Sequence, residues 1–261
     1  MNSTIPPLGF ESSEFVVRTE RAQRLMEETD LDALLLTTEP EVRYFSGFHT
    51  AFWLSPTRPW FLIVPRKGKP IAVIPEIGRA RMSDTWLDEI ITWPAPRPSD
   101  EGITELSKTL NGLTKRSGII GLPMGTETHI RMPFSDFNKL RENIVNIDIV
   151  DATNLIQELR AIKSEAEISK IRYICQRVSE GFSELHKLIS VGDQEKEVFR
   201  KFRIDLLHRG ADEVPYLVGG SGPNGPTEVI GMPSNRIIKK GDMLMMDCLL
   251  YTSDAADDGL S

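Results

Sequence analysis

The chain has 261 residues, of which 40% are hydrophobic and 26% are charged. This length can form one large or two ordinary globular domains, each with its own hydrophobic core. The 31 basic and 38 acidic residues give a net charge of −7 without any basic run. We therefore expect no nucleic-acid partner and no attachment to an anionic membrane.

The two cysteines indicate a reducing compartment, because they are too few for a disulfide framework and lack the spacing of zinc ligands. The first residues show no basic segment followed by an apolar one, and no apolar run of about 18 residues occurs along the chain. We therefore expect a cytoplasmic protein without a signal peptide or a membrane span.

Residues 14–150 show helical and strand patterns in alternation, which is typical of a single α/β domain. The patterns predict helices at residues 14–28, 38–47, 80–86, 103–113 and 134–142, and strands at residues 31–36, 60–64, 71–74, 90–93, 119–122 and 144–150. The tryptophans are expected in the core or at its rim; they are Trp53, Trp60, Trp86 and Trp93.

A second part of the chain begins near Asp151. Ser164 and Glu167 have the spacing of a capping box, which predicts the start of a long helix. Apolar residues then recur at steps of three and four; they are Ile168, Ile171, Cys175, Val178, Phe182, Leu185 and Ile189. Cys175 lies on this stripe, so we expect it to pack in the core as a small hydrophobic residue. A second helix is predicted at residues 195–209.

Residues 214–247 predict a strand, a glycine-rich loop and a hairpin. Gly241 and Asp242 form a corner that leads into the apolar residues 243–246, and Asp247 closes that strand. A carboxylate at a strand end can serve as a rigidly held metal ligand. The same pattern also describes an ordinary hairpin corner entering a core strand, so the pattern alone leaves both readings open.

Three segments together resemble the creatinase, prolidase and Xaa-Pro aminopeptidase superfamily: residues 159–168, 221–225 and 233–247. The resemblance implies an α/β amino-terminal creatinase-like domain, at residues 14–150, followed by the first part of an α+β pita-bread domain, at residues 151–261.

The resemblance also implies a chemistry. In this superfamily two divalent ions (Mn, Co, Zn or Fe) lie among two Asp, one His and two Glu side chains and activate water for attack on the carbonyl of a peptide or small amide. Only Asp247 matches a ligand position of the family. Asp258 has the family's spacing from Asp247, but the Gly-Tyr turn that should precede it is missing, so we interpret that spacing as coincidence. No residue matches a catalytic position.

A histidine that family peptidases carry shortly before their Pro-x-x-Arg-like turn is absent, because residues 221–235 contain none and Ile230 occupies the corresponding place. This difference leaves open a branch that acts on another small amide, a carbon-nitrogen bond or a sulfonium compound. Of the four histidines, only His49 is considered for a place near substrate; His129, His186 and His208 are not.

The family pattern stops at Cys248, so residues 248–261 are interpreted as a frame-shifted or foreign tail. Two hypotheses remain. The chain is a fragment of a dinuclear-metal hydrolase that is a homodimer in its full-length form, and it is inactive as written because one carboxylate cannot hold two ions. Alternatively, it is a non-catalytic interaction protein that uses the same fold.

Overall fold

The computed structural model describes residues 5–55, 58–114 and 117–251. They form two compact units. The first unit is Phe10–Lys163, and the second unit contains residues 164–251 together with residues 5–9.

The first unit is built on a six-stranded mixed sheet with the strand order β4-β3-β2-β1-β5-β6. Strands β1 and β2 and strands β2 and β3 pair antiparallel, whereas β3 and β4, β1 and β5, and β5 and β6 pair parallel. The strand bounds are β1 Ala33–Leu36, β2 Phe61–Pro65, β3 Ile71–Pro75, β4 Glu89–Trp93, β5 Gly118–Leu122 and β6 Ile147–Asp151.

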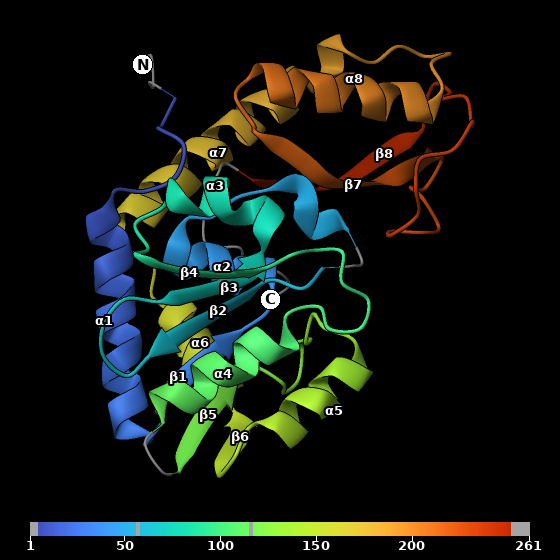
Figure 1. Ribbon diagram of the computed structural model, residues 1–261. Helices are drawn as coiled ribbons and strands as arrows, with labels where there is room; N and C mark the ends of the chain where they lie inside the picture. Colours follow the sequence, from blue (N-terminus) through green and yellow to red (C-terminus); the bar gives the residue numbers. More distant parts are fainter. Residues whose placement is uncertain (1–4, 56–57, 115–116, 252–261) are drawn as a thin grey trace. The chain divides into compact units, whose positions relative to one another are not determined.

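Helices cover both faces of this sheet (Figure 1). Helices α1, α2 and α6 contribute buried side chains to the core on one face, and α4 and α5 contribute to the core on the other. The bounds are α1 Ser12–Glu28, α2 Glu39–Ser46, α3 Arg79–Ser83, α4 Ile103–Leu113, α5 Phe134–Asn143 and α6 Thr153–Ala161, with short 3-10 helices η1 Ala51–Leu54 and η2 Glu76–Gly78.

The strands are apolar because the sheet is buried on both faces. Successive residues of β1 point to opposite sides: Leu34 and Leu36 enter one core, and Ala33 and Leu35 enter the other. The helices and strands expected from residues 14–150 are present, with ends shifted by a few residues.

Helix α6 places the division between the units later than the expected boundary near Asp151. Its Leu155, Ile156 and Leu159 are buried in the core of the first unit. The carbonyl of Leu159 also accepts hydrogen bonds from Tyr44 Oη, at 3.3 Å, and Arg21 Nη2, at 3.2 Å. The compact first unit therefore continues through Lys163.

The second unit has two helices over a two-stranded antiparallel sheet (Figure 1). Its elements are α7 Glu165–Glu184, the 3-10 helix η3 Leu185–Lys187, α8 Glu195–His208, β7 Glu213–Gly222 and β8 Met243–Tyr251. The expected capping box is confirmed: Ser164 Oγ accepts from Glu167 N at 3.2 Å, and Glu167 Oε2 accepts from Ser164 N at 2.7 Å.

The expected burial of Cys175 is wrong, because its side chain is exposed. Helix α7 buries Tyr173, Ile174 and Gly181 instead. At Gly181 the two helices approach closely: an added Cβ would lie 2.8 Å from Leu206 Cδ2 of α8. At this point of α7 the buried face therefore runs through Ile174 and not through Cys175, which is one residue away from the predicted stripe.

Within the residues that the structure describes, no helix combines the length and the apolar character needed to cross a membrane.

Candidate functional site

Asp247 lies in the middle of β8 and not at its end, because the strand runs from Met243 to Tyr251. The expectation of a strand terminus is therefore corrected. Asp247 pairs with Val218 of β7. Side chains alternate along a strand, and those of Met246 and Cys248 pack on the core beneath the helices. The exposed Asp247 carboxylate thus points from the opposite face of the sheet.

The helix side of the sheet carries a buried carboxylate that sequence analysis missed. Glu195, the first residue of α8, is 3% exposed. Its Oε1 accepts hydrogen bonds from Ser221 N, at 2.8 Å, and Ser221 Oγ, at 2.6 Å. Its Oε2 accepts from Ser234 N, at 3.0 Å, and Ser234 Oγ, at 2.6 Å. Four donors therefore satisfy the buried carboxylate.

Glu195 is held in its charged form. Burial acts to raise its pKa, but the hydrogen bonds from Ser221 and Ser234 outweigh burial, and the pKa lies below its ordinary value. No local pattern could have identified this group, because its partners lie 26 and 39 residues later in the chain.

Arg236 joins this cluster to the corner before β8. Its guanidinium donates to both carboxylate oxygens of Asp242, at 2.6 and 2.9 Å, and to Ser221 Oγ at 2.7 Å. The hydrogen bonds from Arg236, followed by the one from Lys239 N, lower the pKa of Asp242. The Gly-Asp corner is thus fixed by a planar two-point ion pair.

Residues 223–233, which we call the site loop, run beside β7. Gly219 N donates to Gly231 O at 3.0 Å, and Gly219 pairs with Met246, the residue before Asp247. Gly219 has a φ of +132°, where an added Cβ would collide with Met245 O, so this position requires glycine. The neighbouring Ile230 side chain is 71% exposed. An apolar side chain therefore stands on the loop where family peptidases are expected to carry a histidine.

The residues that the structure describes do not by themselves fit a two-ion centre. Among them, no three His, Cys, Asp or Glu side chains are placed to hold a metal ion. Burial, followed by the neighbouring Asp247 charge, raises the pKa of Cys248 to about 11, so its thiol is protonated at neutral pH and is a poor ligand. Asp247 is one carboxylate, whereas a divalent ion needs several donors.

The histidines His49, His129, His186 and His208 are all exposed. Trp53, Trp60 and Trp93 are buried in the cores of the first unit, and Trp86 is half-buried against one of them, as expected. Asp258 and tail residues 252–261 lie outside the described residues.

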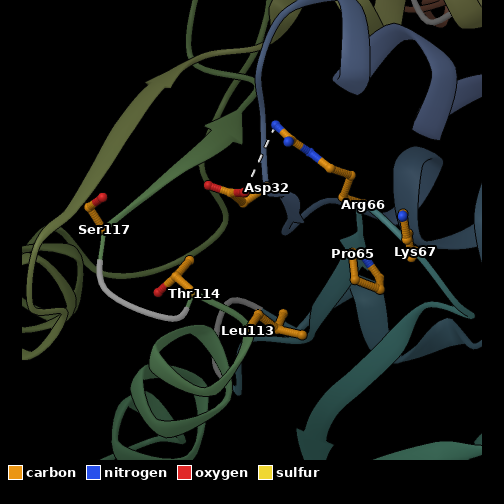
Figure 2. Close-up of a pocket in the computed structure, with 7 residues that line it drawn as sticks. All are labelled: Asp32, Pro65, Arg66, Lys67, Leu113, Thr114 and Ser117. Carbon is orange, nitrogen blue, oxygen red and sulfur yellow. Dashed lines mark ion pairs between the residues drawn. The ribbon is translucent and has the colours of Figure 1, made fainter.

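The first unit has a cavity of about 790 Å³ at the amino-terminal ends of β1 and β5 (Figure 2). Asp32 and Arg66 face one another there, and Arg66 Nη2 lies 3.9 Å from Asp32 Oδ1 and 2.9 Å from Asp30 Oδ1. Asp32 Oδ2 also accepts from Ile119 N at 2.9 Å. These charges already hold the strand ends together. Because α/β sheets bind ligands at the carboxyl ends of strands, we assign no function to this cavity.

Comparisons with known proteins identify a family for residues of the first unit and relatives for most of the chain. The family described as "Creatinase/Prolidase N-terminal domain" matches residues 18–162. A Mycobacterium tuberculosis protein named probable dipeptidase PepE is 22% identical over 242 residues, covering 91% of this chain and 60% of its own length. A Rhizobium rhizogenes protein named agropine synthesis cyclase is 27% identical over 194 residues, covering 70% of this chain and 46% of its own.

The fold is shared with solved structures. A Bacillus anthracis Xaa-Pro dipeptidase matches with a TM-score of 0.73 and 21% identity, covering 92% of this chain and 62% of its own. The chain thus spans about 60% of the length of the dipeptidase that it matches. Its fold is an α/β creatinase-like domain followed by the first part of an α+β pita-bread domain. Because the family match covers more than half of the sequence, the chain belongs to the creatinase/prolidase family.

Proposed function

We propose that this chain is part of a hydrolase that acts on a peptide or a small amide, and that Asp247 is one ligand of a divalent metal in that enzyme. The observation that carries the proposal is the exposed Asp247 carboxylate, opposite Val218 on the sheet face away from α7 and α8. The names of the relatives, a dipeptidase and an Xaa-Pro dipeptidase, support a peptide or amide substrate.

The 261-residue chain itself should be inactive. Two divalent ions each need several ligands to compensate for the water that they lose on binding, and one carboxylate cannot supply them. Purified chain is incubated with Mn²⁺ or Co²⁺ and Xaa-Pro dipeptides, and proline release is compared with a metal-free control. Turnover above that control would overturn this part of the proposal.

The ligand role of Asp247 is tested in the protein that the gene encodes once its DNA has been sequenced again, from an independent sample, across codon 248. We call this protein the re-read protein. Asp247→Asn should lose bound metal and reduce hydrolysis by at least the roughly 100-fold seen for outer-shell partners of metal ligands. Asp148→Asn is the matched control, because Asp148 is also an exposed aspartate within a strand. Equal metal content in both variants would contradict the assignment.

A second candidate is a family branch without peptidase chemistry. The exposed Ile230 can neither donate nor accept a hydrogen bond to a reacting peptide, and one relative is named a cyclase rather than a peptidase. If the re-read protein binds metal but leaves Xaa-Pro peptides intact while hydrolysing or cyclising another small amide, this branch is favoured. Replacement of the remaining metal ligands by apolar residues in the re-read sequence would instead favour a non-catalytic interaction protein.

We also propose that the full-length protein is a homodimer, as the family resemblance implies. Light scattering of the re-read protein at several concentrations tests this, and a monomer at all of them would contradict it.

A further inference from the structure

The ends of the site loop meet at one side chain. Ser221 precedes the loop and Ser234 follows it, and both donate their backbone N–H and hydroxyl groups to the Glu195 carboxylate at 2.6–3.0 Å. The backbone of α8 adds two more contacts: Glu195 N donates to Arg236 O at 2.9 Å, and Lys196 N donates to Ser234 O at 3.1 Å.

The middle of the loop is fixed less firmly. Backbone hydrogen bonds to β7 run from Gly219 N to Gly231 O, at 3.0 Å, and from Gly225 N to Gly222 O, at 3.1 Å. Pro226 lies over Gly220, where an added Cβ would be 3.3 Å from Pro226 Cβ. The exposed Val229, Ile230 and Met232 add little packing. The position of the loop therefore depends mainly on its closed ends, because bringing the ends of a flexible segment together restricts all of it.

We propose that Glu195 is a positioning residue of the candidate site. Its carboxylate holds the two ends of the site loop together and so keeps Ile230 beside β7, the strand that pairs with Asp247 of β8. The inference rests on the proposed function for the role of Asp247. Glu195 itself touches neither Asp247 nor, in this arrangement, a substrate; it acts through Ser221 and Ser234. The charged groups that face it are Arg236 and, beyond that guanidinium, Asp242.

Hydrogen exchange of the 261-residue chain tests this directly. Glu195→Gln keeps the shape of the side chain but turns an NH₂ group toward donors that need an acceptor. We expect exchange of peptides covering residues 222–234 to accelerate by about ten- to a hundredfold, the effect of losing a charge-assisted hydrogen bond. Peptides covering residues 199–206 of α8 should keep their protection, since a local opening leaves the helix core intact.

Two further variants keep the test decisive. Glu197→Gln removes another carboxylate from the first turn of α8. The Glu197 carboxylate pairs with Arg200 at 3.1 Å, so its replacement should leave the exchange of the site loop unchanged. Ser234→Ala removes the hydroxyl donor at the carboxyl-terminal end of the loop and keeps the backbone N–H that donates to Glu195 at 3.0 Å. It should accelerate loop exchange even if Glu195→Gln fails to fold. Unchanged loop exchange in Ser234→Ala, or equal acceleration of loop and α8 in Glu195→Gln, would overturn the proposal.

A proximity measurement separates positioning from simple stabilisation. In the wild type, weakly bound Mn²⁺ should broaden the amide resonances of Val218, Met246 and Gly231 together, and Asp247→Asn should abolish that broadening. In Glu195→Gln the ion should still broaden Val218 and Met246 but lose Gly231. If Mn²⁺ broadens none of them in the wild type, the proposed ligand role of Asp247 fails, whereas the exchange data still decide the role of Glu195.

Discussion

Arg236 and Asp242 face each other across the corner before β8, with Nη1 to Oδ2 at 2.6 Å and Nη2 to Oδ1 at 2.9 Å. The Asp242 side chain is 4% exposed and also accepts from Lys239 N at 2.7 Å. The same guanidinium reaches Ser221, which is bound to Glu195. One side chain thus links the hairpin corner, β7 and the amino terminus of α8.

The two-point geometry of this pair predicts that Arg236→Lys destabilises the second unit. Lysine keeps the charge but cannot donate two parallel bonds to one carboxylate. Hydrogen exchange of residues 236–247 should accelerate, while tryptophan fluorescence, which reports only the first unit, should show an unchanged unfolding midpoint. Arg200→Lys is the control, because Arg200 lies in an exposed pair with Glu197. Equal exchange in the two variants would contradict the prediction.

The second unit should lose stability in acid. The pKa values of Asp242 and Glu195 are both lowered in the folded state, so the unfolded chain binds protons more readily. Their contribution is present above the ordinary values of 3.8 and 4.5 and is lost as the pH falls through the lowered folded values. Exchange-measured stability should stay level above about pH 5 and decline below it.

Asp242→Asn supplies the matched comparison for this acid response. The variant should be less stable than the wild type at pH 7 and should show a flatter dependence on acid. The two curves should converge at the lowest pH values. Parallel curves over the whole range would show that another group causes the loss.

Local signals in the sequence were sufficient for much of the fold. The pattern of residues 38–47 predicted a short helix, and α2 occupies that segment with Gly47 left-handed at its carboxyl end, at a φ of 72°. The Ser164 and Glu167 spacing predicted the capping box that begins α7. These features are read from residues a few positions apart, so local chemistry determines them.

Tertiary contacts determine the features that the sequence patterns did not predict. Cys175 followed the three- and four-residue spacing of the apolar stripe, yet the position of α8 selects the face that contains Ile174 and Gly181. The apolar run that stops at Asp247 predicted the end of a strand there, but pairing with β7 continues to Tyr251. The Glu195 cluster was missed because its members come from three segments that only folding brings together.

The buried Glu41 should make the stability of the first unit depend on pH in the opposite direction. Its carboxyl group is buried, its Oε2 has no hydrogen-bond partner, and burial raises its pKa despite opposing backbone hydrogen bonds and the charges of Arg160 and His129. The folded state therefore binds this proton more tightly than the unfolded chain does. Its contribution is present below the ordinary value of 4.5 and is lost as the pH rises through the raised folded value.

Glu41→Gln should remove this dependence. The wild-type first unit should lose stability as the pH increases above 4.5, and the variant should be flatter over that range. Urea unfolding followed by tryptophan fluorescence measures it, since all four tryptophans lie in the first unit. Glu27→Gln changes an exposed glutamate of α1 and serves as the control. A slope in Glu41→Gln equal to that of the wild type would contradict the assignment.

Two helical glycines should respond to alanine with opposite signs. At Gly181 a Cβ would lie 2.8 Å from Leu206 Cδ2 and 3.3 Å from Phe202 Cε2, so Gly181→Ala must displace the buried Leu206 side chain or move α7 away from α8. Overpacking of this kind costs about 1–3 kcal/mol. At Gly112 of α4 an added Cβ meets nothing within 4 Å, so Gly112→Ala should stabilise the first unit by about 0.5–1 kcal/mol through helix propensity alone.

The measurement for each glycine follows the unit in which it lies. Exchange of α7 and α8 peptides reports on Gly181→Ala, and tryptophan fluorescence reports on Gly112→Ala. In a Leu206→Ala background the added methyl group has more room, so Gly181→Ala should cost less there than it does in the wild type. A Gly181→Ala variant as stable as the wild type would contradict the predicted cost of overpacking.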